Sequence, residues 1–384
     1  MGWNRLAIGI PLLLLAVVAL AVFAFDPLAK FGDGLPPEEA LVVERVTADT
    51  GGIVAHIRGD GRDPVQIAQV QVDGAYWAFA QEPTGPLHRL AAAQITVPYP
   101  WVAGETHHMR FVTSTGATFE YTIDVARTSP AASPNILFSL ALLGLFVGVV
   151  PVALGMMTLP LLRRMGSEGI VFAMALTIGL LAFLLVDTLS EGLELATEAA
   201  SAFQGDVAVW MAAALTFLGL TAISRRSNLP TGGVALATWL ALGIGFHNFG
   251  EGLSIGVALS VGNAALGSLL IVGFTVHNLS EGVAIVAPVS RRKVTFAMLV
   301  GWAALAGLPA VAGAWIGAFT FVPHWGAVFF GIAAGAILQV MIEVGRTIWS
   351  IRGSENESAP AGTAFAGFGA GVLVMYATAF LVQV

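Results

Sequence analysis

Long apolar runs alternate with short polar loops over most of the chain, and this pattern predicts membrane-spanning helices. The first run, Leu6–Phe25, is longer than the core of a typical cleaved signal peptide. We therefore expect residues 1–30 to form an uncleaved transmembrane anchor, although residues 22–24 would also pass as a cleavage site. Residues 135–384 are expected to form a bundle of eight helices. Its apolar runs, each near the roughly 20 residues that a bilayer helix needs, are 135–160, 169–194, 207–224, 233–261, 264–289, 294–318, 325–350 and 363–384.

Residues 38–127 break this pattern, because short alternating runs replace the long apolar ones. Pairs such as Asp73-Gly74 and Thr115-Gly116 mark the turns between them. The pattern predicts a small all-β domain, an antiparallel sandwich of immunoglobulin-like type. Residues 128–134, rich in proline and serine, are expected to be a linker. The seven predicted strands are Leu41–Val46, Ile53–Arg58, Gln66–Val72, Tyr76–Ala80, Ile95–Val97, His108–Thr113 and Thr118–Val125.

The composition supports an all-α polytopic membrane protein with this β domain added. Hydrophobic residues make up 57% of the chain and charged residues 11%, whereas about 25% of the residues of a soluble globular protein are charged. Cysteine is absent, which excludes thiolate metal sites and disulfides. Metal ligands must then be His, Asn, Asp or Glu, and these donors suit borderline divalent ions. The net charge of −7 is spread over the β domain and the loops, so it says little about partners. We expect contact with the lipid bilayer and none with nucleic acid.

The basic residues predict how the chain crosses the membrane. They fall in alternate loops of the bundle, and the positive-inside rule places those loops in the cytoplasm. The N-terminus is then cytoplasmic, whereas the β domain and Val384 are extracytoplasmic. We expect a multi-pass protein of the cell (inner) membrane. The basic loop residues are Arg163, Arg164, Arg225, Arg226, Arg291, Arg292, Lys293, Arg346 and Arg352.

A six-residue phrase occurs twice, at His247–Gly252 and at His277–Gly282, each time inside an apolar run. Histidine and glutamate are four residues apart in both copies, so each pair shares one helix face. An ionisable side chain near the bilayer centre costs about 2.5 kcal/mol or more, and a bound cation would compensate that cost. Repetition on consecutive, antiparallel helices is typical of inverted-repeat transporters. The alternative, in which these polar side chains only hold helices together, is weaker because carboxylates rarely have that role.

The two phrases, H-N-F-G-E-G and H-N-L-S-E-G, resemble the fourth and fifth transmembrane helices of the ZIP family of divalent metal transporters. The resemblance covers residues 135–384 and includes the helix number and an outward C-terminus. It implies that His247, Glu251 and Glu281 form the primary metal site. His277 stands where family members vary, and we include it among the ligands. The resemblance also implies that Asn248 and Asn278 contribute to a second, adjacent metal site, and we include both among the candidate metal ligands. It further implies pathway positions for Asp187 and Glu191 on helix two and for Gln339 and Glu343 on helix seven.

The chain departs from the family on helix six. Many members have a metal-bridging glutamate there, and the corresponding stretch of this chain, residues 307–313, has Ala310 and no carboxylate. We therefore expect one well-formed metal site and a weak or absent second one. His324 has no assigned role. The β domain holds four histidines, which we interpret as solvated residues rather than metal-capturing ones: His56, His88, His107 and His108. The adjacent pair would point to opposite faces of a strand and could not chelate together.

These observations predict a transporter that moves divalent metal ions into the cytoplasm by alternating access. Zinc is the favoured substrate, and iron, manganese, cobalt or cadmium would fit the same ligands. The metal is cargo, so we expect neither an enzyme nor a resident cofactor. Two rivals remain: an intramembrane metal-dependent hydrolase, and a metal-sensing receptor. The sequence leaves open whether the chain forms a homodimer.

Overall fold

The computed structural model describes residues 13–18, 20–21, 38–226, 233–260, 264–352 and 361–383. The chain divides into two units, Met1–Glu38 and Glu39–Val384. In the first unit, the described residues of the predicted anchor, 13–18 and 20–21, are helical. The rest of the predicted anchor lies outside the described residues.

The β domain consists of two four-stranded antiparallel sheets, in the orders β1-β2-β6-β5 and β4-β3-β7-β8. Their apolar inward faces share one core that includes Ile53, Ile95 and Phe111. The strands are β1 Leu41–Asp49, β2 Gly52–Gly59, β3 Ile67–Val72, β4 Ala75–Trp77, β5 Ala80–Glu82, β6 Ala92–Val97, β7 His107–Thr113 and β8 Thr118–Ile123.

The sequence predicts about seven strands and the structure has eight, because the run Tyr76–Ala80 contributes to two strands. Its first part belongs to β4, which pairs with β3, and its last residue begins β5, which pairs with β6. The chain therefore passes from one sheet to the other within this run. Alternation of side chains continues across such a crossing, so the sequence pattern alone does not reveal it.

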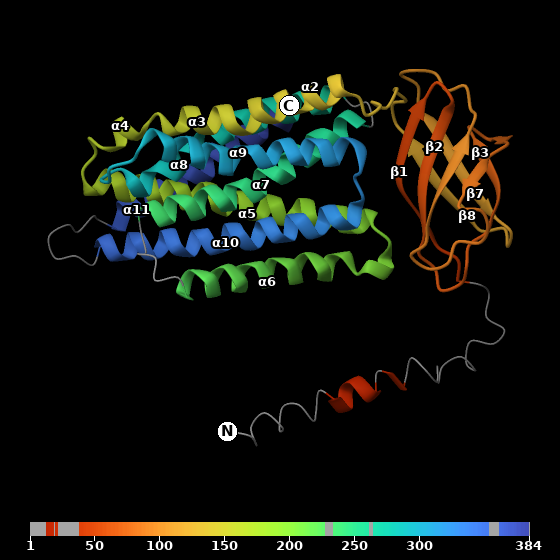
Figure 1. Ribbon diagram of the computed structural model, residues 1–384, viewed down its shortest axis with the longest axis horizontal. Helices are drawn as coiled ribbons and strands as arrows, with labels where there is room; N and C mark the ends of the chain where they lie inside the picture. The colour runs from red at the N-terminus through yellow and green to blue at the C-terminus, as the bar shows by residue number, and fades with distance from the viewer. Residues whose placement is uncertain are drawn as a thin grey trace. The chain divides into compact units, whose positions relative to one another are not determined.

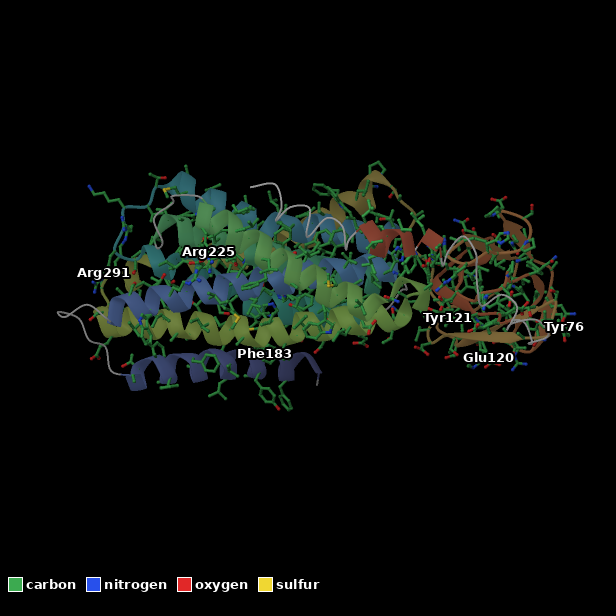
Figure 2. The ribbon with its side chains drawn as sticks, turned by 90° about the horizontal axis from the view of Figure 1, so that it is seen from below. Tyr76, Glu120, Tyr121, Phe183, Arg225 and Arg291 are labelled. Carbon is green, nitrogen blue, oxygen red and sulfur yellow. The ribbon has the colours of Figure 1, made fainter. Side chains whose placement is uncertain are left out.

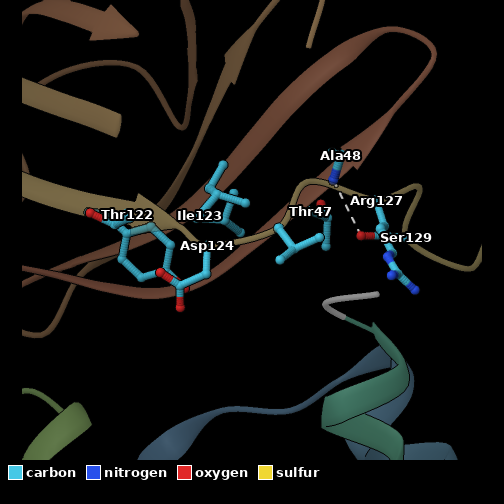
Figure 3. A pocket seen from close by; sticks show the side chains of 10 residues that line it. Thr47, Ala48, Thr122, Ile123, Asp124, Arg127 and Ser129 are labelled. Atoms are coloured by element: carbon cyan, nitrogen blue, oxygen red, sulfur yellow. Dashed lines mark hydrogen bonds between the residues drawn. The ribbon is translucent and has the colours of Figure 1, made fainter. Parts of the chain in front are cut away.

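The predicted linker is fixed to the β domain at one end and caps a helix at the other. The Ser129 N–H donates to the Ala48 carbonyl at 2.8 Å, and the Ala48 N–H donates to Ser129 Oγ at 3.2 Å (Figure 3). Ser133 then caps the first helix of the bundle, because its Oγ accepts the Ile136 N–H at 3.3 Å. Pro134 follows at the first helical position, where its missing N–H costs nothing.

The bundle helices run side by side (Figure 1). They are α2 Pro134–Gly144, η2 Leu145–Val149, α3 Val150–Met156, α4 Leu159–Leu162, α5 Ser167–Glu198, η3 Ser201–Phe203, α6 Gly205–Arg226, α7 Val234–Ser260, α8 Ala264–Val286, η4 Ala287–Val289, α9 Phe296–Phe319, α10 Pro323–Arg352 and α11 Ala361–Gln383. Of the described residues, seven helical segments are long and apolar enough to cross a membrane. The 27-residue helix α7 is not one of them, since the polar residues of its phrase lower its hydropathy. The predicted count of eight spans in the bundle stays a prediction.

The helix with the first phrase is central in the bundle. It packs along α9 and also contacts α8 and α10, and 17 of its 27 residues are buried. By contrast, only 6% of the 18-residue apolar stretch within Ser201–Arg225, the segment that includes α6, is buried inside the protein. The helix that carries His247, Asn248 and Glu251 is therefore well shielded, as expected if its charged side chains have a partner there.

Candidate metal centre

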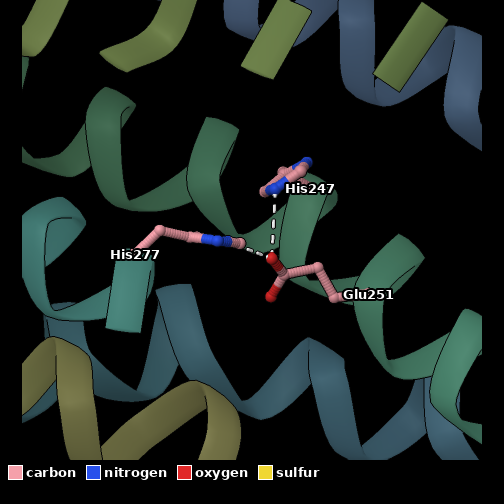
Figure 4. Close-up of side chains that lie close together, drawn as sticks. All are labelled: His247, Glu251 and His277. Carbon is pink, nitrogen blue, oxygen red and sulfur yellow. Dashed lines mark hydrogen bonds and ion pairs between the residues drawn. The ribbon is translucent and has the colours of Figure 1, made fainter. Parts of the chain in front are cut away.

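Three potential metal ligands converge inside the bundle (Figure 4). His247 and Glu251 come from α7 and His277 comes from α8, and their ligand atoms all lie within 4.8 Å of one another. Both histidine Nε2 atoms approach the same oxygen, Glu251 Oε1, that of His247 at 3.3 Å. All three side chains are buried. Two imidazole nitrogens and a carboxylate are a donor set for zinc and other borderline divalent metals.

The second phrase contributes its histidine to this group but not its glutamate. Glu281 lies one turn after His277 and is only 1% exposed. Neither oxygen of the Glu281 carboxylate makes a hydrogen bond of good geometry among the described residues, although the carboxylate interacts with the Asn248 side chain and with the charges of His247 and Glu251. A buried carboxylate without a donor is costly. A cation beside the cluster would compensate Glu281 as well as Glu251.

The side chains of Asn248 and Asn278 are oriented so that each Oδ1 atom is left without a hydrogen-bonding partner among the described residues. Asn248 donates its side-chain N–H to the Ala306 carbonyl at 3.1 Å. Asn278 donates to the Val147 carbonyl at 3.1 Å and to Glu251 Oε2 at 2.9 Å. Both side chains are fully buried, and within the described chain neither Oδ1 atom has a partner. Both amide oxygens are therefore free to bind a cation.

Thr188 on α5 is a residue that the sequence reasoning missed. Its Oγ1 lies 3.1 Å from His247 Nδ1, and its side chain is 1% exposed. When a histidine binds a metal through Nε2, its Nδ1–H is commonly held by an oxygen acceptor that fixes the ring. Thr188 can supply that oxygen. A threonine in an apolar helix is common, so no sequence signal distinguishes this one.

The predicted pathway residues of α5 lie near the cluster without joining it. Asp187 is exposed, and its charge interacts with those of both histidines and Glu251. Glu191 is half-buried and accepts a hydrogen bond from Ser254 Oγ of α7 at 3.1 Å.

The predicted pathway residues of α10 have different surroundings. Gln339 is 1% exposed, and neither polar atom of its side chain has a partner among the described residues. Glu343 accepts hydrogen bonds from Arg346 at 2.9 Å and from Ser224 of α6 at 3.3 Å. The structure therefore ties Glu343 to α6 and to its own helix rather than to the cluster.

Glycines bring α7 very close to α9. A Cβ atom on Gly252, the last residue of the first phrase, would collide with the Ala310 carbonyl oxygen. A Cβ atom on Gly313 of α9 would collide in turn with the Phe249 carbonyl oxygen. Small residues permit such close backbone contact in membrane helices, and here the contact brings the Ala306 carbonyl within reach of Asn248.

The second phrase packs against α3 in the same manner. A Cβ atom on Gly282 would collide with the Val152 carbonyl oxygen, and one on Gly155 with the Leu279 carbonyl oxygen. Gly282 and Leu279 occupy the same positions in the second phrase as Gly252 and Phe249 in the first. The neighbouring helices thus contain a repeat of their own, P-x-x-x-G, at Pro309–Gly313 and at Pro151–Gly155. The two phrases are therefore packed in similar ways against their neighbouring helices.

The histidines of the β domain do not join the cluster. His107 is buried and His108 is exposed, as expected for neighbours on a strand. His107 has both ring nitrogens engaged, with Asp73 at 2.7 Å from Nδ1 and the Val102 N–H at 3.3 Å from Nε2. Burial acts to raise the pKa of Asp73, but hydrogen bonds from the His108 N–H, Tyr99 and His107 lower it to about 2. His107 therefore supports the turn at Asp73 rather than offering a metal ligand.

No protein-family model matches the chain, and no curated protein matches it. Within the part of the chain that the structure describes, the fold and site define a mostly helical protein with seven apolar segments of membrane-spanning length. Its interior contains a buried His/Glu/His group that could hold a metal ion.

Proposed function

We propose that this chain is a ZIP-like transporter that moves divalent metal cations, with zinc as the favoured substrate, into the cytoplasm. The observation that supports this most strongly is the convergence of His247, Glu251 and His277 between two buried helices. Two imidazoles and one carboxylate meet at this point, and the same two phrases also contain the buried Glu281 carboxylate and two amide oxygens without partners among the described residues. Such donors can replace the hydration shell of a divalent ion inside an apolar bundle.

The packing of the helices supports movement of the ion through the site. Helices α3, α7, α8 and α9 pack against one another, and α5 packs against α10 and α11. The cluster lies on the first group. From the second group, Thr188 contacts His247, Glu191 contacts Ser254, and α10 packs against α7. Relative movement of the two groups would exchange these contacts and open the site to the other side, as in alternating access.

The contacts of the β domain agree with the proposed orientation. The Asp60 carboxylate accepts the N–H groups of Ser201 and Ala202 at 2.8 and 2.9 Å, in the connection between α5 and α6. Arg45 donates to the Phe319 carbonyl at 2.7 Å, at the end of α9. Both connections lack the basic residues of the proposed cytoplasmic loops. Arg225 and Arg291 lie toward the opposite end of the bundle (Figure 2). The strand orders of the two sheets also support an immunoglobulin-like assignment.

We further propose that one metal ion binds at a time. Helix α9 offers no carboxylate at Ala310, whose carbonyl is packed against Gly252. Its contribution near the site is the Ala306 carbonyl, which holds an asparagine amide. A second cation would therefore lack an additional negative ligand from α9.

The proposed function is tested by metal influx into proteoliposomes that contain the full-length protein. Wild type and His247→Ala are compared over a panel of divalent ions, with His107→Ala as a matched histidine variant outside the cluster. Saturable influx that His247→Ala abolishes and His107→Ala retains would support transport through this site. Metal binding without flux of any ion would favour the sensor. Hydrolysis of a peptide or lipid that Glu281→Gln abolishes would favour the hydrolase.

A further inference from the structure

The carbonyls that hold the two asparagines are not equivalent. In a regular α-helix, the Ala306 carbonyl accepts the N–H of residue 310, which is alanine and has one. The Val147 carbonyl would accept the N–H of residue 151, which is proline and has none. Val147 therefore lacks its α-helical donor, and the Asn278 amide donates to it at 3.1 Å.

A π-helical turn produces this difference. The P-x-x-x-G repeats of α3 and α9 correspond, but Pro151 follows Val147 by four positions (151 − 147) and Pro309 follows Ala306 by three (309 − 306). The extra residue lies in η2, and π turns of this kind are frequently found at functional sites. In α9 the proline deprives Leu305 of its donor instead, and that carbonyl holds neither asparagine.

We propose that Pro151 is a positioning residue for metal binding, an inference that rests on the transport function proposed above. The Asn278 amide nitrogen is committed to two acceptors, the Val147 carbonyl and Glu251 Oε2. A flipped amide would set its oxygen against both acceptors, and repulsion would disfavour it. Asn278 Oδ1 is thereby left for the cation.

The same contact also orients a primary ligand. Because the Asn278 amide holds Glu251 Oε2, the other carboxylate oxygen, Oε1, is the one presented to His247 and His277. A chain of contacts therefore runs from Pro151 through Val147 and Asn278 to Glu251. If the Val147 carbonyl were occupied by another donor, Asn278 Oδ1 and Glu251 Oε1 would both be held less firmly.

The test uses Co²⁺ binding to the full-length protein in detergent, followed by the visible spectrum of the bound ion. Four proteins form a cycle: wild type, Pro151→Ala, Asn278→Ala and the double variant. Pro151→Ala restores an N–H that competes for the Val147 carbonyl. We expect Co²⁺ affinity to fall about three- to tenfold, the range for one hydrogen bond inside a protein, with a changed spectrum. In the Asn278→Ala background the same substitution should have no further effect on affinity.

Pro309→Ala is the matched control, since the N–H that it restores would meet the Leu305 carbonyl. Its effect on Co²⁺ affinity should be the same with and without Asn278. An equal loss from Pro151→Ala in both backgrounds, an unchanged spectrum, or a Pro151→Ala protein that does not fold would overturn the positioning role. If the four proteins bind Co²⁺ as expected but the wild type moves no metal into proteoliposomes, the transport function is refuted and the positioning role of Pro151 stands. A wild-type protein that binds no Co²⁺ would overturn both proposals.

Discussion

The contact between α8 and α3 leaves no room for a side chain at Gly282, and this makes a sharp test of the site's construction. In a Gly282→Ala variant, the new Cβ atom would collide with the Val152 carbonyl oxygen and lie 2.9 Å from the Gly155 Cα atom. Ordinary contacts between such atoms are about 3.5–4.0 Å. The two helices must therefore separate by roughly 1 Å.

This separation would act on the site one turn away. The hydrogen bond from Asn278 to the Val147 carbonyl is 3.1 Å long, and about 1 Å more would break it. Overpacking typically costs about 1–3 kcal/mol, whereas replacing glycine by alanine inside a helix gains up to about 1 kcal/mol. Gly369→Ala on α11 is the matched control, because open space surrounds that position and only the gain applies.

We expect the free energy of unfolding of Gly282→Ala to be about 1–3 kcal/mol below that of Gly369→Ala. Thermal unfolding in detergent compares the two variants, and Co²⁺ titration measures their metal affinity. Affinity should fall about tenfold or more in Gly282→Ala, because metal ligands must be held to within about 0.5 Å. Equal stability and equal affinity of the two variants would refute the role of this glycine contact.

Three other predictions follow from particular contacts. Thr188→Val should weaken metal affinity about 10–100-fold, the usual loss when a histidine ligand loses its partner, while the melting temperature changes little; equal affinity in a zinc competition assay would contradict this. The pKa of Asp73 is lowered from its ordinary 3.8 to about 2, so its stabilising effect is complete above pH 3.8 and is lost as the pH falls through 2. Asparagine tolerates the φ of 51° at this position, so Asp73→Asn should lower the melting temperature at pH 7 and make the melting temperature fall less between pH 4 and pH 2. The same dependence of melting temperature on pH in both proteins would show that the Asp73 charge does not stabilise the fold. Metal uptake should weaken from pH 7 to 5 as ligands protonate, and uptake that rises instead would indicate proton coupling.

The sequence predicted the helical parts well because long apolar runs leave little choice. The run at 169–194 corresponds to α5, Ser167–Glu198, and the run at 294–318 to α9, Phe296–Phe319. The spacing of His247 and Glu251 fixed their shared helix face, and the structure brings His277, a predicted ligand on the neighbouring helix, into the same group. These features depend on local periodicity, which a sequence contains in full.

Other features depend on contacts between distant segments. The hydrogen bond of Thr188 to His247 requires α5 and α7 to lie side by side, and no local pattern in α5 indicates it. The π turn at η2 has a proline nearby, but prolines in helices usually accompany simple kinks. The P-x-x-x-G repeat becomes recognisable only once Gly313 and Gly155 are seen against the two phrases.

The central claim is that one divalent ion is held between the two phrase-bearing helices. Diffraction from zinc-loaded crystals, recorded on both sides of the zinc absorption edge, tests it most directly. We predict one anomalous peak, at about 2.0–2.2 Å from the Nε2 atoms of His247 and His277 and from a Glu251 oxygen. Two fully occupied peaks would contradict the single site. A peak on the β-domain histidines with none at the cluster would contradict the account as a whole.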